Sequence, residues 1–166
     1  MPPNIRRVAY IYPVGVNPIY LHSVETAALS LGAQIVAMPV SDAAGMKAAI
    51  EAFAAEPNGG LLQTPGIADT ASLELIPLAA HYRLPAIYGR RFLSANGGLL
   101  SYDSDPAEWV RGGLTYVDRL LRGAKVSDLP VQYPTKFRLV INLTTAKALG
   151  LSVPTSILLR ADEVIE

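Results

Sequence analysis

Short apolar runs alternate with longer amphipathic segments along most of this chain, and this alternation constrains its fold more than any other feature. An apolar run of about four to eight residues is typical of a buried strand, whereas apolar residues that recur every third or fourth position are typical of a helix. Strands separated by helices form a parallel sheet that is covered on both faces. We therefore predict an α/β fold, a doubly wound, Rossmann-like sandwich with five consecutive parallel strands.

The positions of these elements, and most of their ends, follow from residue types. Gly32 suits the left-handed end of the first helix, and Pro57 stops the second. Pro77 falls inside the third predicted helix and lacks the N–H that bonds four residues back, so we expect a kink or a late start there. The predicted strands are Arg7–Tyr12, Gln34–Val40, Gly60–Thr64, Pro85–Gly89 and Gly98–Tyr102, and the predicted helices are Tyr20–Leu31, a segment capped by Ser41 or Asp42, and Ala68–Tyr82.

The clearest helix start in the chain is at Asp105, an N-cap that is followed by Pro106 and, three residues on, by Glu108. Two adjacent glycines, Gly112 and Gly113, cost about 1 kcal/mol each inside a helix, so we expect close backbone packing as compensation. The apolar side of this helix comprises Trp109, Val110, Leu114, Val117 and Leu121, and the helix ends at Gly123.

Composition narrows the classes of function. The chain has 166 residues, enough for one domain with a substantial core, and 51% of them are hydrophobic, so disorder is not expected. A formal net charge of zero removes the electrostatic case for nucleic acid or an anionic membrane surface as a partner. No apolar run approaches the length of a membrane span, and we expect no signal peptide in these residues. With zero cysteines, disulfides and thiolate metal sites are excluded.

No motif predicts a cofactor or a catalytic centre. The loop Pro13–Pro18 after the first strand has one glycine, not the Gly-x-Gly-x-x-Gly of a dinucleotide site. Neither a Gly-Lys-Ser/Thr phosphate loop nor a Gly-x-Ser-x-Gly nucleophile elbow is present. A phosphorelay receiver would need clustered carboxylates at its strand ends, whereas the third strand here runs into Gln63–Gly66. We expect no cofactor and no enzymatic activity.

Three further groups of ionisable residues have simple structural explanations. His22 and Glu25 lie three residues apart on one helix but lack a third ligand, so a solvated helix face is favoured over a metal site. His81 lies near a helix end, where it suits the helix dipole. Arg90 and Arg91 can bind a carboxylate or a phosphate, but exposed arginines are common and an ordinary solvated loop is favoured.

The second half of the chain carries a recognisable set of segments. Together they resemble the C-terminal part of ABC-transporter substrate-binding proteins related to tryptophan- and tyrosine-binding lipoproteins. The resemblance covers most of the chain and is strongest after position 84. Its segments are Leu84-Pro85-Ala86-Ile87-Tyr88-Gly89, Gly97-Gly98-Leu99-Leu100-Ser101-Tyr102, and a run that includes Pro134, Lys136-Phe137, Val140-Ile141-Asn142, Lys147-Ala148-Leu149-Gly150-Leu151 and Arg160-Ala161-Asp162-Glu163-Val164-Ile165-Glu166.

This resemblance implies one lobe, the C-terminal one, of a type I periplasmic-binding-protein-like clamshell. We expect the first lobe and the export signal to lie outside this sequence, and Met1–Asn4 to be an expression start or an interlobe remnant. Residues 1–123 would form the Rossmann-like ligand-binding lobe. Residues 124–166 would supply a hinge or crossover strand at Phe137–Asn142, a short helix around Thr145–Leu149, and a tail packed on the lobe.

The implied function is the solute-binding component of an ABC-type uptake transporter, which binds a small ligand such as an aromatic or apolar amino acid and docks on a membrane permease. The native full-length protein is then expected in the periplasm or lipid-anchored outside the cytoplasm. We expect an isolated lobe to bind ligand weakly and to self-associate, for example as a homodimer, through apolar surface left open between the lobes. The alternative is a ligand-sensing domain of a signalling protein, which a downstream helical linker would distinguish. A small enzyme on the same sheet is a third class.

The predicted site lies at the carboxyl ends of the strands, where such folds bind ligands. An amino-acid-like ligand needs donors for its carboxylate, an acceptor for its ammonium and a surface on which its side chain stacks. Asp103 is the predicted partner of the ammonium, and its competing role is a turn cap before Asp105. For each tyrosine, the two competing roles are contact with the ligand and capping of the hydrophobic core. The predicted ligand-binding residues are Asn17, Tyr20, Thr64, Tyr88, Tyr102 and Asp103, flanked by Pro65, Gly66, Gly89 and Ser101.

Overall fold

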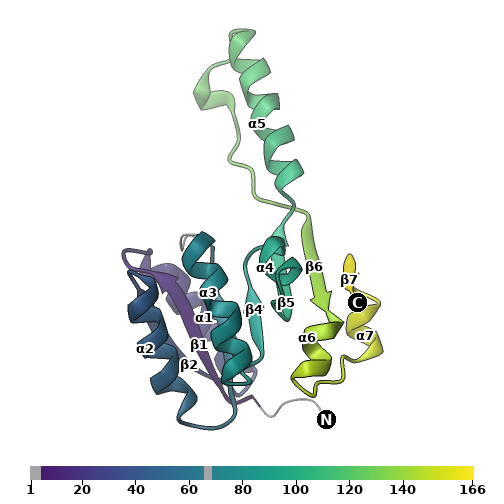
Figure 1. The fold of residues 1–166 in the computed structure, drawn as a ribbon. Coiled ribbons are helices and arrows are strands. Elements are labelled where there is room, and N and C mark those ends of the chain that lie inside the picture. Colours follow the sequence, from purple (N-terminus) through teal and green to yellow (C-terminus); the bar gives the residue numbers. More distant parts are fainter. Residues whose placement is uncertain (1–4, 66–68) are drawn as a thin grey trace.

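The computed structural model describes residues 5–65 and 69–166, and within them the chain forms one seven-stranded sheet (Figure 1). Gly66 of the predicted site, the predicted helix start at Ala68 and the segment Met1–Asn4 lie outside the described residues. The strand order across the sheet is β2-β1-β3-β4-β5-β6-β7. The strands are β1 (Arg7–Pro13), β2 (Gln34–Val40), β3 (Gly59–Gln63), β4 (Ala86–Tyr88), β5 (Leu100–Ser104), β6 (Phe137–Asn142) and β7 (Glu163–Ile165).

Strands β1 to β5 pair in parallel, which confirms the predicted doubly wound α/β fold. β6 then pairs antiparallel to β5, and β7 pairs parallel to β6. The strand predicted at Phe137–Asn142 is therefore an integral part of the same sheet. β7 was not predicted, because three residues are too few to show a period and only pairing with β6 makes them a strand.

Two helices begin at caps that the sequence indicated, Asp42 and Asp105, whereas the first helix begins two residues before its predicted start, after the N-cap Asn17. The Asp42 carboxylate accepts a hydrogen bond from the Gly45 N–H at 2.7 Å, which lowers the pKa of Asp42, and the Asp105 carboxylate accepts one from the Ala107 N–H at 2.9 Å. The third helix runs through Pro77. The helices are α1 (Pro18–Ser30), α2 (Ala43–Ala54), α3 (Asp69–His81), α4 (Arg91–Ala95), α5 (Pro106–Leu121), α6 (Leu143–Ala148) and α7 (Thr155–Leu158), with a 3-10 turn η1 (Val126–Asp128).

The main hydrophobic core lies between the sheet and the layer of α2, α3 and α4. Side chains alternate between the two faces of a strand, so Ala9 and Ile11 of β1 face this layer while Tyr10 faces the other side, towards α1. Ile50 of α2 and Leu75 of α3 are completely buried in this core. The five parallel strands are thereby held as a rigid frame for the loops at their ends.

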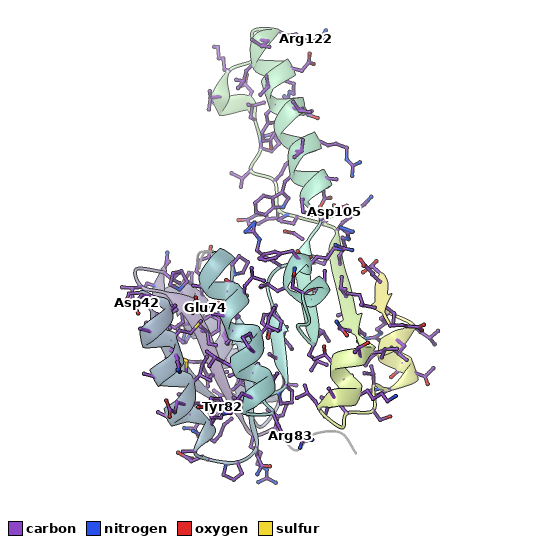
Figure 2. The ribbon with its side chains drawn as sticks, in the orientation of Figure 1. Asp42, Glu74, Tyr82, Arg83, Asp105 and Arg122 are labelled. Atoms are coloured by element: carbon purple, nitrogen blue, oxygen red, sulfur yellow. The ribbon has the colours of Figure 1, made fainter. Side chains whose placement is uncertain are left out.

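Helix α5 stands apart from this body, on an arm that comprises residues 106–136 (Figure 1). No residue of α5 is buried. Figure 2 shows Asp105 at the base of the arm and Arg122 at its far tip. The base is narrow, since Ser104 pairs with Phe137 at the end of the β5–β6 ladder and the Asp105 N–H donates to the Lys136 carbonyl at 3.0 Å.

Hydrogen bonds hold the arm in shape. The Glu108 carboxylate accepts from the N–H groups of Thr135 and Lys136, at 3.1 and 3.0 Å, and from the Thr135 hydroxyl. The Thr135 hydroxyl and the two N–H groups lower the pKa of Glu108. Nearer the tip, the Tyr116 hydroxyl donates to the Pro130 carbonyl. The arm is thus a helix braced by its own return segment.

The close packing expected at the two glycines of α5 is absent from the described residues. A Cβ added to Gly113 would meet nothing within 4 Å, and one added to Gly112 would meet only the Gln132 side chain, at 3.3 Å. The expectation of close backbone packing was wrong, because within the described residues Gly112 approaches only a side chain of the return segment and Gly113 approaches nothing. Among residues 5–65 and 69–166, no helix is both long and apolar enough to span a membrane.

Candidate functional site

The carboxyl ends of β1, β3, β4 and β5 lie at one end of the sheet, because these strands are parallel. The arm leaves from the same end, directly after β5 (Figure 1). Ligands of doubly wound folds bind outside this end. The candidate site is therefore the rim formed by the loops that follow these strands.

The loop after β1 carries two predicted residues. Oδ1 of Asn17 accepts a hydrogen bond from the Ile19 N–H at 3.0 Å, which makes Asn17 the N-cap of α1, with Pro18 as the first residue of the helix. Tyr20 lies in the first turn and is 61% exposed. Tyr20 is accessible to a ligand, whereas the amide oxygen of Asn17 is committed to the start of α1.

Thr64 extends the pairing of β3 with β1 beyond the end of the strand. Its N–H and its hydroxyl both donate to the carbonyl of Ile11, at 3.1 and 3.2 Å. The side chain is partly buried. In this structure the hydroxyl of Thr64 therefore stabilises the junction of the two strands.

Gln63 was not among the predicted residues, although it joins three elements of the rim. Its Oε1 accepts from the Gly89 N–H at 3.2 Å, and its Nε2 donates to the Thr64 carbonyl and lies 3.4 Å from the Ser72 hydroxyl on α3. The side chain is only 2% exposed. A buried amide must find hydrogen-bond partners. A glutamine at the end of an otherwise apolar strand was therefore the signal in the sequence that could have identified Gln63.

The end of β4 is shaped by close packing. A Cβ on Gly89 would lie 2.4 Å from Cδ of Pro65, so only glycine lets the two loops meet here. Tyr88 belongs to the hydrophobic core, where it is 1% exposed and where burial raises the pKa of its hydroxyl. Its ring therefore supports the rim from below and does not face the solvent above it.

Asp103 lies where β5 approaches the start of α4. Its Oδ2 accepts a hydrogen bond from the backbone N–H of Arg91 at 3.1 Å, and its Oδ1 is buried without a hydrogen-bond partner among the described residues. The carboxylate therefore bonds to the first residue of α4. Capping the turn before Asp105, the competing role expected for it, is not the role that it has here. Within the part of the chain that is described, one of its two oxygens remains unpaired.

Arg91 is committed to an ion pair with the C-terminal strand. Its Nε and a terminal nitrogen donate to the two carboxylate oxygens of Glu163, at 2.7 and 2.6 Å. This pairing lowers the pKa of Glu163 and raises that of Arg91. The expectation that Arg90 and Arg91 lie in an ordinary solvated loop is therefore wrong for Arg91, whose partner is 72 residues away in sequence.

Tyr102 forms an aromatic platform at the base of the arm. Its ring stacks on Phe137, with centroids 5.4 Å apart and planes 10° from parallel, and it is 55% exposed. Successive residues of a strand point to opposite faces, so Tyr102 and Asp103 lie on opposite sides of the sheet. Ser101, between Leu100 and Tyr102, is completely buried.

The structure thus brings the predicted residues to one end of the sheet but not into one cluster. Tyr20 and Tyr102 are exposed, Asn17, Thr64 and Asp103 already make hydrogen bonds within the chain, and Tyr88 is buried. For the part of the chain that is described, no group of three or more metal-ligating side chains lies together.

A comparison with family models finds one match that covers almost the whole chain. The model described as ABC transporter substrate binding protein matches residues 1–165. No match was found among curated proteins.

Several solved structures share the fold. A conserved domain protein from Vibrio cholerae O1 biovar El Tor is 24% identical, with a TM-score of 0.86 over 98% of this chain and 55% of that one. An ABC domain in complex with L-Trp from Streptococcus pneumoniae is 19% identical, with a TM-score of 0.88 over 98% and 56%. A ligand-free, open substrate binding protein with adhesive properties from Clostridium difficile is 17% identical, with a TM-score of 0.70 over 98% and 55%. The present chain therefore spans little more than half the length of these proteins.

Proposed function

This chain belongs to the family of ABC transporter substrate binding proteins, and from that premise we propose that it is one lobe of the solute-binding component of an ABC-type uptake transporter. Proteins of this family bind small ligands, work with membrane permeases and are typically extracytoplasmic. The chain supplies the C-terminal lobe, and the complete receptor acts in the periplasm or from a lipid anchor. Its role is binding and not catalysis, with lobe closure as the signal to the permease.

The observation that carries this proposal is the position of the arm. The arm rises from the end of the sheet that holds the rim, and its helix α5 has no buried residue. A second lobe that packed on α5 would stand directly above the rim, so that a ligand would be enclosed between the two. The narrow base, two backbone segments joined at Ser104–Phe137, has the form of a hinge.

The proposed ligand is an aromatic or other apolar amino acid. Tyr20 and the Tyr102–Phe137 stack offer exposed aromatic surface, and at the same end of the sheet Asp103 has a buried carboxylate oxygen with no partner in the described residues. The structural neighbour crystallised with L-Trp makes this amino acid the first candidate to test. The proposed contacts are Asn17, Tyr20, Thr64, Tyr102 and Asp103, with Tyr88 beneath them.

An NMR titration of the 166-residue chain with L-tryptophan tests the ligand class and the site together. We expect weak binding, because the second lobe is missing, with shifts of the amide signals of Tyr20, Thr64, Tyr102 and Asp103. Glycine and L-glutamate serve as control ligands and should leave these signals in place. Absence of shifts at millimolar L-tryptophan, or shifts confined to α2 and α3, would contradict the proposal.

The substitution Asp103→Asn tests the proposed partner of the ligand ammonium. Loss of a charge-assisted hydrogen bond costs roughly 1.5–3 kcal/mol, so the affinity should fall about ten- to a hundredfold. Asp162→Asn, at an exposed carboxylate on the far side of β6, is the matched control. If Asp103→Asn lowers the melting temperature and leaves the affinity unchanged, Asp103 only holds the start of α4.

A further inference from the structure

The face of the sheet opposite α2 and α3 holds an apolar groove of about 480 Å³. Its floor contains Leu62, Ile87 and Leu100, which are register partners on β3, β4 and β5 and so point to the same side. One wall is α1, with Val24, and its C-cap Leu31, and the residues that line the groove are all aliphatic, glycine or proline. Parallel strands are normally covered on both faces, yet Ile87, on a central strand, is 42% exposed.

The groove has the width of one helix. The three strands of its floor lie about 4.8 Å apart, which makes the floor about 10 Å wide, and this is the diameter of an α-helix with its side chains. Helix α1 already packs on β2, at the edge of the sheet. The part of the sheet that no described helix covers therefore fits one further apolar helix, laid along the strands.

Helix α5 carries an unpartnered surface of the matching kind. Its outer stripe is Val110, Leu114, Val117 and Leu121, which recur at helical spacing and are 51–84% exposed. The return segment of the arm packs against the other side, around Trp109 and Tyr116, so it leaves the outer stripe open. Gly113, beside the stripe, has open space at its Cβ position and permits a close approach to another surface.

Helix α5 cannot reach the groove of its own chain. The groove lies at the amino-terminal part of the strands, since Val8 and Leu100 near the starts of β1 and β5 line it. The arm leaves from the opposite end, after Ser104, and points away from the body (Figure 1).

We propose that the 166-residue chain forms a two-fold symmetric dimer in which the outer stripe of α5 lies in the apolar groove of a second copy, and the exchange is reciprocal. The two-fold axis lies perpendicular to the strands, so the strands of the second copy run in the opposite direction. Each α5 then runs antiparallel to the strands of its partner, as crossover helices such as α1 run antiparallel to the strands that they cover. Neither surface carries a charged residue and the formal net charge is zero, so no charge repulsion opposes the contact. This dimer is a property of the 166-residue chain, and in a receptor whose second lobe packs on α5 the same stripe would be occupied by that lobe.

Disulfide trapping tests this arrangement without interference, because the chain has no cysteine. One protein carries Ile87→Cys in the groove and a second carries Leu114→Cys in the stripe. On mild oxidation of the mixture, we expect a disulfide-linked heterodimer on a non-reducing gel. Leu159→Cys, at a residue that is 82% exposed outside both surfaces, replaces Ile87→Cys in the control and should give no heterodimer.

Light scattering coupled to size exclusion measures the same dimer without cross-links. We expect the mass of a dimer for the native sequence and of a monomer for Leu114→Asp, whose folded state is checked by circular dichroism, while the matched Leu159→Asp stays dimeric. A monomer of the native sequence at every concentration would overturn the proposal. So would a homodimer linked through Ile87→Cys alone, which would place two grooves face to face, or a ladder of higher oligomers, which would mean an open exchange.

Discussion

The body and the arm of this protein contain the same kinds of residue in different surroundings. Ile50 and Leu75 in the helices of the body are completely buried, whereas Leu114 and Leu121 in the arm are 63% and 84% exposed. Both regions have well-formed helices with side-chain caps at their starts, Asp42 in the body and Asp105 in the arm. A helix can thus be specified by its local sequence and still leave its apolar side without a partner.

The two regions are also held together differently. The body depends on apolar burial between the sheet and α2, α3 and α4. The arm depends on hydrogen bonds, chiefly those that the Glu108 carboxylate accepts from Thr135 and Lys136. Apolar burial contributes far more free energy than exposed hydrogen bonds do, so the same change in side-chain volume should have different effects in the two regions.

The largest expected difference is between two leucine-to-alanine substitutions. Leu75→Ala removes a completely buried side chain from α3 and should lower the free energy of unfolding by about 2–5 kcal/mol. Leu121→Ala, at the exposed tip of α5, should change it by less than about 0.5 kcal/mol. Urea denaturation at a concentration at which the chain is monomeric measures both. Equal effects would mean that the arm is packed on the body in solution.

A second pair, of glycine-to-alanine substitutions, should have effects of opposite sign. In Gly98→Ala the new Cβ would lie 2.8 Å from the Leu93 carbonyl oxygen and 2.7 Å from the Tyr88 ring, which should cost about 1–3 kcal/mol. In Gly113→Ala the new Cβ meets nothing within 4 Å, and alanine favours the helix by about 1 kcal/mol. Gly98→Ala should lower the thermal midpoint. Increased helicity of the monomer, measured by circular dichroism, should accompany Gly113→Ala. A loss of helicity there would show that a partner already occupies that space.

The smallest expected effects concern the stability of the protein at acid pH. The pKa of Glu163 is lowered by its bonds to Arg91 in the body, and that of Glu108 by the Thr135 hydroxyl and neighbouring N–H groups in the arm. A lowered folded pKa stabilises the protein above the unfolded value, near 4.5, and this stability is lost as the pH falls through the folded pKa.

Glutamine variants assign this acid sensitivity to the two regions. Glu163→Gln should weaken the dependence of the melting temperature on pH between neutrality and the acid side of pH 4.5. Glu108→Gln should leave that global dependence nearly unchanged and speed amide hydrogen exchange in the first turns of α5. If Glu108→Gln instead alters the global transition, the arm and the body unfold as one unit.

Much of the body was predictable from the sequence because its signals are local. The apolar runs predicted β1 to β5 within a few residues, and the prolines, glycines and acidic caps predicted most helix ends. Four elements were missed: α4, η1, α7 and β7, which have three to five residues each, too few to show a period. The separation of α5 from the sheet was also not foreseen, because an apolar helical side does not identify the surface that it will meet.

The candidate site was predicted as a position more successfully than as a set of side chains. The topology of parallel strands is enough to place Asn17, Thr64 and Asp103 at one end of the sheet. Whether each side chain faces a ligand depends on its partners: Thr64 bonds to Ile11, and Asp103 bonds to the start of α4. The importance of Gln63 follows only from the arrangement of Gly89, Thr64 and Ser72 around it.

The sequence by itself determined the class of fold, the order of its longer strands and helices along the chain, and the caps that begin α2 and α5, because each depends on residues close together in the chain. The tertiary structure alone decided that Arg91 pairs with Glu163, that Tyr88 is buried and that α5 stands on an arm away from the apolar groove. These features join residues that are far apart in sequence. Their free energy comes from burial and hydrogen bonding across the whole fold, which no local pattern of residues encodes.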